Sequence, residues 1–336
     1  MRDIAMRATD FRPHRLLRSP HVQSVLASSG VRRWLFRRRR QALEGAAVEH
    51  ILDCGGGVRL QGFHSAQRVL PQPRGLLVLL HGWEGSVDSS YLLHTGARML
   101  AEGWDVFRLN FRDHGDTHHL NPEMFHSCRI DEVVGAIAEV ARRWPLRPLA
   151  LSGFSLGGNF ALRVALRAPA AGIALDRVIA VCPAIHPPSI LDAIERAPWF
   201  YHDYFMLKWR GSLRRKRRLY PEQVHLSDAE LRHDMRTLTR VMVERHTDFG
   251  SLDNYLNGYS IAGDILAGLR VPATILTAAD DPIIPVTDFH GLTLAPGTEL
   301  DIAPAGGHCG FIRDLSLRSW TEDYIAEKLA QTLPRG

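Results

Sequence analysis

Ser155 stands in a setting that can make its hydroxyl a nucleophile. The stretch GFSLG over residues 153–157 fits the pattern G-x-S-x-G, follows the apolar run 148–154 and opens a helix-like segment. This strand–turn–helix context is that of a nucleophile elbow, where small residues on either side of the serine allow a sharp, strained turn. The alternative is a glycine-rich turn that happens to contain serine. The context favours the nucleophile.

A serine hydroxyl needs a histidine base, which a carboxylate must orient. The chain has 17 histidines, so position has to choose among them. After a nucleophile elbow, the acid and then the histidine follow along the chain, on loops after later strands. His308, which has glycine neighbours and follows the strand-like run near 298–303, is the expected base. His290 lies before that strand and fits poorly.

The acid is expected directly after the apolar run 271–278, where Asp280 and Asp281 are adjacent. Both qualify, and one of them has the alternative role of capping the following turn. The spacing D-P-x-x-P over residues 281–285 favours Asp281, with Asp280 as the reserve.

Backbone N–H groups are expected to stabilise the oxyanion that forms when a serine attacks a carbonyl. One comes from the residue after the nucleophile and one from the loop HGWEGS at 81–86. These residues are Leu156 and Trp83. The alternative for 81–86 is an ordinary strand–helix turn.

The elements around these residues alternate between apolar strands and helices, which predicts βαβ units and a parallel sheet. A hairpin with a glycine turn is expected first, at 46–54 and 58–65. The expected strands are 75–80, 104–110, 148–154, 177–184, 271–278 and 298–304, and the expected helices are 89–102, 130–143, 155–168 and 316–332.

Residues 186–269 interrupt the alternation with a polar, aromatic and basic composition. An insertion this long is not a plain crossover, so a helical cap is expected. Within it, Ser227 and Glu230 have capping-box spacing and predict a helix over 227–246. The expected organisation is a basic N-terminal extension at 1–45, a core formed by 46–185 and 270–336, and a cap at 186–269.

The chain has 336 residues, of which 45% are hydrophobic and 23% charged, so it is globular rather than disordered or fibrous. Its net charge of +5 is unevenly distributed. Residues 1–50 and 208–218 each carry +7, and the rest of the chain carries −9. No helix-turn-helix, zinc or RNA-binding signature accompanies this charge, so no nucleic-acid partner is expected.

Each basic run has two interpretations. In residues 31–40, arginines flank the large apolar residues Trp34, Leu35 and Phe36 on both sides. This segment either docks peripherally on anionic membrane lipid or packs across the core through those three side chains. The run 208–218 either faces an acidic head group beside the aromatic residues of the cap or forms a solvated helix face.

Four scattered cysteines form no C-x-x-C pair, which argues against a zinc ribbon or a redox motif. No metal or organic cofactor is expected. Neither a secretory signal nor a run of about 18 apolar residues is found. We therefore expect a protein of the cytoplasm that does not span a membrane.

The chain resembles the α/β-hydrolases over about residues 10–330. HGWEGS, NFR (110–112), GFSLGGN, ADDP (279–282) and GGHCGF (306–311) carry the resemblance. SPHVQS (19–24) is similar to the P-H-L-Q-T signature of the YheT-like branch, itself similar to mammalian ABHD-type ester and phospholipid hydrolases. The resemblance implies a mostly parallel sheet flanked by helices, with a helical cap. It also implies a serine hydrolase with the triad Ser155, Asp281 and His308.

The chain departs from this branch in one loop. The branch has N-F-R-G-C where this chain has NFRDHGD (110–116), a difference that concerns the substrate pocket rather than the triad. We interpret this loop as structural, with His114 a weak candidate for a base or ligand. The expected reaction is hydrolysis of a small-molecule or lipid carboxylic ester. The alternatives are a thioesterase or acyltransferase with the same triad, and a non-catalytic lipid-binding protein.

Overall fold

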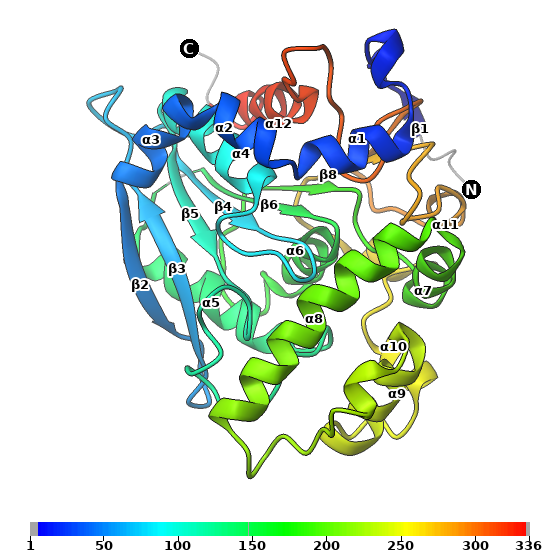
Figure 1. Cartoon of the computed structure of the whole chain (residues 1–336). Coiled ribbons are helices and arrows are strands. Elements are labelled where there is room, and N and C mark those ends of the chain that lie inside the picture. Colours follow the sequence, from blue (N-terminus) through cyan, green and yellow to red (C-terminus); the bar gives the residue numbers. More distant parts are fainter. Residues whose placement is uncertain (1–5, 147, 334–336) are drawn as a thin grey trace.

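A nine-stranded sheet forms the centre of the computed structural model, which describes residues 6–146 and 148–333 (Figure 1). Its order is β1-β9-β8-β7-β6-β4-β5-β3-β2. Neighbouring strands are parallel except where β3 pairs with β2 and β5. The strands are β1 Met6–Ala8, β2 Ala47–Asp53, β3 Arg59–Ser65, β4 Leu76–Leu80, β5 Asp105–Leu109, β6 Leu149–Phe154, β7 Arg177–Val181, β8 Ala273–Ala278 and β9 Thr298–Ala303. The predicted hairpin and mostly parallel sheet are confirmed.

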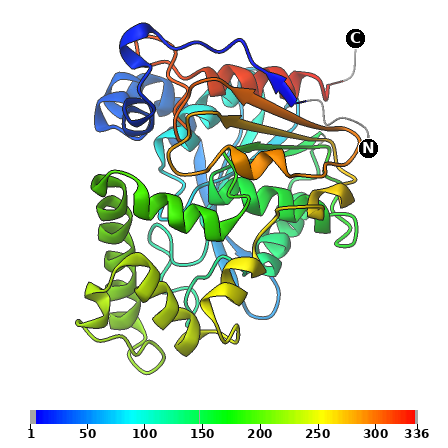
Figure 2. The ribbon, with the colours of Figure 1, turned by 90° about the vertical axis from the view of Figure 1, so that its right-hand side faces the viewer.

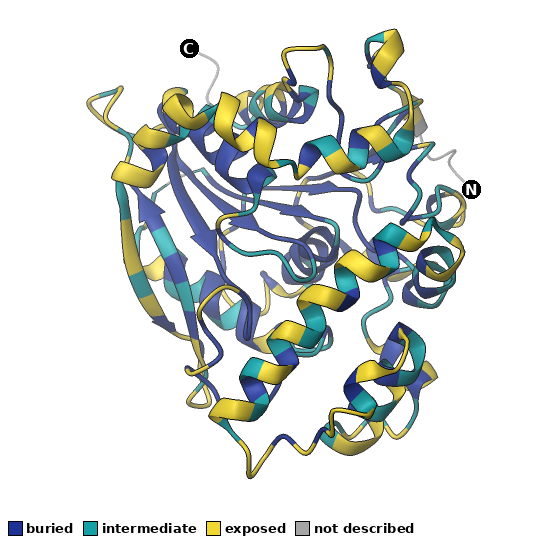
Figure 3. Cartoon of the chain, in the orientation of Figure 1, coloured by how far each residue is buried: buried dark blue, intermediate teal, exposed yellow. Residues whose placement is uncertain are grey.

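Helices cover both faces of the sheet, because its central strands are apolar on both sides. In β4 all five side chains are fully buried: Leu76, Val78 and Leu80 join one core, and Leu77 and Leu79 join the other. The first core includes residues of α5 (Ile130–Arg143) and α6 (Leu156–Arg167), and the second those of α3 (Arg37–Gly45), α4 (Ser90–Ala101) and α12 (Trp320–Ala330). In Figure 3 the central strands are correspondingly dark blue, whereas the edge strand β2 is largely exposed.

The N-terminal segment is tied to the sheet by β1, which pairs with β9 (Figure 2). It continues through η1 (Arg15–Leu17), α1 (Pro20–Ala27), α2 (Gly30–Leu35) and α3. The sequence did not reveal β1, since three residues are too short to show a strand period. Residues 1–5, 147 and 334–336, which the expected extension and core include, lie outside the described residues.

The chain between β7 and β8 is mainly helical, and α8 crosses the molecule diagonally in Figure 1. Its elements are α7 Pro187–Arg196, α8 Trp199–Leu219, η2 Glu230–Arg232, α9 Met235–His246, α10 Leu252–Gly258 and η3 Ile265–Gly268. A short helix, α11 (Thr287–His290), follows β8. Within the described residues, no helix is both long and apolar enough to cross a bilayer.

The predicted helix over 227–246 is wrong in its first eight residues. Ser227 and Glu230 do form the reciprocal hydrogen bonds of a capping box, but these close only the single turn η2. The backbone then becomes extended at His233, and Asp234 caps the separate helix α9 through the N–H of Thr237. A second good cap within the segment explains the split.

Candidate active site

Ser155 lies at the sharp turn between β6 and α6, with the strained backbone angles φ 55° and ψ −121°. A Cβ at Gly153 would lie 2.0 Å from the carbonyl oxygen of Gly157, and one at Gly157 would lie 2.4 Å from that of His81. Both positions therefore require glycine, as a nucleophile elbow demands. The turn presents the hydroxyl beyond the carboxyl end of the sheet.

Three side chains of the expected site form one hydrogen-bonded chain. His308 Nε2 lies 3.0 Å from Ser155 Oγ, and His308 Nδ1 lies 2.9 Å from Asp281 Oδ2. The other oxygen of Asp281 accepts the N–H groups of Ile283 and Ile284 at 2.8 and 2.9 Å. Because a carboxylate accepts hydrogen bonds, the neutral imidazole carries its one proton on Nδ1, and its Nε2 is then free to accept from Ser155.

The two other candidates for these roles lie elsewhere. Asp280 does not contact the imidazole; its Oδ1 accepts the N–H of Gly307 at 2.9 Å and so holds the loop that carries His308. His290 is exposed at the end of α11. The D-P-x-x-P spacing thus pointed to the aspartate that reaches the imidazole.

Two N–H groups beside Ser155 are unpaired. Those of Trp83 and Leu156 have no acceptor within the described part of the chain. The loop after β4 is held by His114, whose Nε2 accepts the N–H of Glu84 at 3.2 Å while Nδ1 donates to the Arg112 carbonyl at 2.7 Å. Burial lowers the pKa of His114 to about 4, so it stays neutral and structural.

Helix α1 holds the loop of His308 from the other side, a contact that sequence reasoning missed. The N–H of His308 donates to Ser24 Oγ at 2.8 Å, and Ser24 Oγ donates to the Pro20 carbonyl at 2.7 Å. The fully buried Gln23 accepts the N–H of Ile312 at 2.6 Å and donates to its carbonyl at 3.0 Å. These residues belong to SPHVQS, the stretch that carried the branch resemblance without a role.

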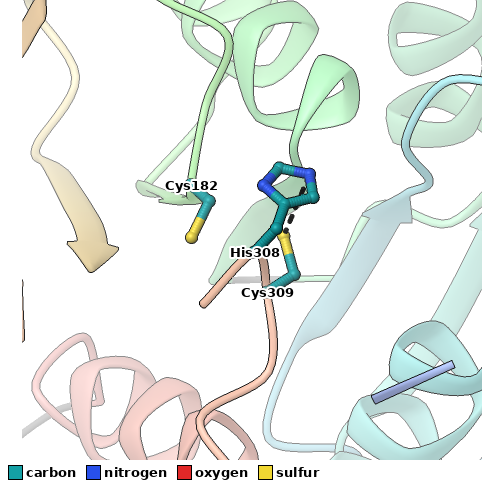
Figure 4. Close-up of side chains that lie close together, drawn as sticks. All are labelled: Cys182, His308 and Cys309. Carbon is teal, nitrogen blue, oxygen red and sulfur yellow. Dashed lines mark hydrogen bonds between the residues drawn. The ribbon is translucent and has the colours of Figure 1, made fainter. Parts of the chain in front are cut away.

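Two thiols lie beside the base (Figure 4). Cys182, His308 and Cys309 each offer a ligand atom, all within 4.8 Å of one another, so they could hold a soft metal ion. Cys309 Sγ is 4.0 Å from His308 Nε2, the nitrogen that faces Ser155. An ion there would compete with the serine, so this cluster belongs to the serine site and is no separate metal centre.

The charge around His308 favours its protonated form. Burial alone would lower its pKa, but the carboxylate of Asp281 and the neighbouring Cys309 more than offset this, and the pKa is raised well above its ordinary value. Desolvation opposes ionisation of Cys309, yet contacts with Cys182 and His308 lower the pKa of its thiol to about 6. The imidazole must therefore lose a proton before it can act as a base.

The basic run 208–218 is mostly engaged with the protein. Lys216 is buried and donates to Asp113 at 2.7 Å, within the loop NFRDHGD that departs from the branch pattern. Arg215 pairs with Asp116 of the same loop at 2.7 Å. Lys208 donates to the Glu84 carbonyl at 3.0 Å, but unlike Lys216 it is exposed, and it lines the cavity at Ser155. The loop 110–116, whose sequence differs from the branch pattern, therefore anchors α8 to the core through these two ion pairs.

The segment 31–40 does not pack across the core as one of its interpretations required. Trp34 and Leu35 are 63% and 45% exposed, and of the three apolar residues only Phe36 packs inward, against His94. Arg32 is buried and paired with Glu322.

Comparison with known proteins identifies the family of the chain. The model of the alpha/beta hydrolase fold family matches residues 75–315, which contain every residue of the serine site. The chain belongs to the alpha/beta hydrolase fold family. The predicted fold class is therefore confirmed.

Relatives within this family extend over nearly the whole chain. YheT of Escherichia coli strain K12, which its name proposes to be an esterase, is 25% identical over 97% of this chain and 94% of its own length. The embryogenesis-associated protein EMB8 of Picea glauca is 24% identical over 95% of this chain and 72% of its own. The predicted resemblance to the YheT-like branch is thus confirmed.

Solved structures share the fold at lower identity. The esterase Pf2001 of Pyrococcus furiosus superimposes with a TM-score of 0.55 at 14% identity, covering 86% of this chain and 93% of its own. The 2,6-dihydroxy-pseudo-oxynicotine hydrolase superimposes with a TM-score of 0.59 at 16% identity, covering 94% of this chain and 77% of its own.

Proposed function

We propose that this hydrolase cleaves carboxylic esters through an acyl-enzyme on Ser155. The Ser155 oxygen attacks the ester carbonyl carbon while His308 Nε2 takes the hydroxyl proton. Asp281 holds the imidazole in the required tautomer and stabilises its positive charge. The tetrahedral oxyanion accepts the N–H groups of Trp83 and Leu156.

Two bond-breaking steps complete the cycle. The bond to the leaving oxygen breaks, and His308 gives that oxygen its proton, so the alcohol departs. Water then attacks the acyl-enzyme, with His308 as base, and the carboxylic acid leaves while Ser155 regains its proton. The observation that carries this proposal is the unbroken chain from Asp281 through His308 to Ser155 at the turn of β6 into α6.

A fluorophosphonate probe tests the nucleophile. The wild type is expected to label and Ser155→Ala to remain unlabelled; equal labelling of both proteins, or none of the wild type, overturns the proposal. Asp281→Asn is expected to lower kcat by about 10⁴-fold, as loss of the orienting carboxylate does in a serine triad. Asp280→Asn is the matched control and retains the carboxylate that faces the imidazole.

Assays with different acyl donors and acceptors distinguish ester hydrolysis from the alternative functions. Product formation from added alcohols in competition with water would indicate an acyltransferase, and a preference for acyl thioesters would indicate a thioesterase. A protein silent towards p-nitrophenyl esters and the probe would point to a non-catalytic lipid-binding role.

We also propose peripheral contact with anionic lipid through residues 31–40. Val31 and Trp34 are 60% and 63% exposed, and Arg37, Arg38 and Arg39 are exposed beside them. Exposed apolar side chains that can enter the bilayer interface, next to arginines that can pair with lipid phosphates, are typical of a segment that binds an anionic membrane surface. Neutralising the three arginines to Gln is expected to abolish sedimentation with phosphatidylglycerol vesicles. The control is Arg214→Gln with Arg218→Gln, and equal loss in both contradicts the proposal.

A further inference from the structure

Two cavities of unequal size meet at Ser155. The larger has a volume of about 720 Å³ and the smaller about 120 Å³. Ser155, Trp83, Phe205 and Ile283 line both, so the nucleophile stands at their junction. An ester bound there would place one of its two arms in each cavity.

The residues lining only one cavity decide which arm goes where. His308 lines only the larger cavity, and Leu156 lines only the smaller. Because His308 must deliver a proton to the leaving oxygen, the alcohol lies on the imidazole side, in the larger cavity. The acyl group then extends past Leu156 into the smaller one.

The smaller cavity admits only a short apolar chain. Its walls include Ile190 and Leu191 of α7, Met235 of α9 and Leu256 of α10. Its volume is about one sixth of that of the larger cavity, so the acyl arm is the shorter arm of the ester, and butyryl is the probe chosen for it.

The larger cavity carries positive charge at its rim. Lys208 of α8 and Arg33 of α2 both line it and are exposed, and they come from segments far apart in the chain. Lys208 Nζ donates to the Glu84 carbonyl oxygen at 3.0 Å and retains further donors. Glu84 is the one carboxylate among the described lining residues, and burial, partly offset by Lys208, raises its pKa to about 8. At neutral pH the cations thus have no carboxylate partner within this cavity.

We propose that the preferred substrate is a short-chain ester whose alcohol carries an anionic group, phosphate or carboxylate, held by Lys208 and Arg33. Lys208 and Arg33 are then specificity-determining residues. This inference rests on the proposed function and adds the chemical class of the substrate. A soluble phosphorylated alcohol and a lipid head group present the same chemistry to these two cations.

Three glycerol esters test the alcohol side. 1-Butyrylglycerol 3-phosphate is expected to show a kcat/KM at least tenfold above that of neutral 1-butyrylglycerol. Lys208→Gln or Arg33→Gln should each reduce that ratio about tenfold, as loss of a charge-assisted hydrogen bond does. Arg214→Gln, which removes the same charge from an exposed position of α8 outside both cavities, should leave the ratio unchanged. 1-Palmitoyl-2-acetylglycerol 3-phosphate in vesicles represents a membrane lipid. Whichever of the two anionic esters is cleaved faster shows whether the anionic group belongs to a soluble alcohol or to a lipid.

A p-nitrophenyl series from acetyl to palmitoyl tests the acyl side. The optimum is expected near butyryl, with at least a tenfold fall by lauryl, and Ile190→Ala should move the optimum to a longer chain. Equal or faster cleavage of the neutral glycerol ester, or an optimum at lauryl or beyond, overturns the inference. In that event, labelling of Ser155 by the fluorophosphonate still supports the proposed function, so the two failures are distinguishable.

Discussion

Removing one hydroxyl from α1 should slow the reaction without unfolding the protein. Ser24 Oγ is the acceptor for the N–H of His308, 284 residues away in sequence. In Ser24→Ala that half-buried N–H loses its partner, which costs about 1–2 kcal/mol. The same loop also directs Nε2 of His308 towards Ser155. We therefore expect the loss of this hydrogen bond to raise the activation free energy by about 1.4 kcal/mol, which lowers kcat tenfold.

The second-order rate of fluorophosphonate labelling is the best assay, because it reports activation of Ser155 by His308 without a leaving alcohol in the cavity. Ser24→Ala should label about tenfold more slowly and lose only about 2 °C in Tm. Ser24→Thr keeps the hydroxyl, places there the residue type of the branch signature, and should restore labelling to within twofold. Wild-type labelling by Ser24→Ala, or failure of Ser24→Thr to rescue at unchanged Tm, refutes the positioning role of α1.

Further predictions concern protons and metal. Because the pKa of His308 is raised, the inactive imidazolium persists to higher pH, and kcat/KM should increase with pH with a midpoint above 6.5. Cys309→Ala should lower that midpoint, since Cys309 contributes to the raised pKa. An unchanged pH profile of Cys309→Ala would contradict that contribution. Burial, and for His94 nearby arginines, lowers the pKa of His94 to about 2 and of His114 to about 4. At pH values between these and the ordinary 6.5, the unfolded chain binds more protons at these two histidines than the folded protein does. The free energy of unfolding should therefore fall on acidification, by up to about 1.4 kcal/mol per pH unit for each imidazole. Urea titrations from pH 7 to 4 measure this, and a free energy of unfolding that does not change with pH would contradict it. Micromolar Zn²⁺ should inhibit reversibly on chelation, and Cys182→Ala with Cys309→Ala should relieve inhibition; equal sensitivity of the double variant would exclude these thiols as ligands.

The core was predictable because its strands are uniformly apolar and its turns carry glycine. Expected and observed bounds of β4, β6 and α5 agree within one residue. β7 ends earlier than expected, at Val181, because the backbone of Cys182 turns to positive φ. A local tertiary constraint of this kind leaves no mark in the hydrophobic pattern.

The site was predictable where chain order and spacing carry information, and not where distant segments meet. Ser155, Asp281 and His308 follow one another in the order that an elbow requires, and the structure brings them together. Gln23 and Ser24 had no such signal, since short polar residues on a helix are ordinary. Lys216 was hidden within a basic run, although it is buried against Asp113.

The contact of α1 with the loop of His308 has a consequence for how a new copy of the protein comes into use. Translation delivers α1 before the nucleophile and the nucleophile before the base, so α1 cannot contact the loop of His308 until the 284 residues that separate Ser24 from His308 have been made. A chain that stops before Asp281 contains Ser155 but lacks both Asp281 and His308, the other two members of the hydrogen-bonded chain. Such shortened chains should be inert towards esters, and full activity should appear only when α1 contacts the loop of His308.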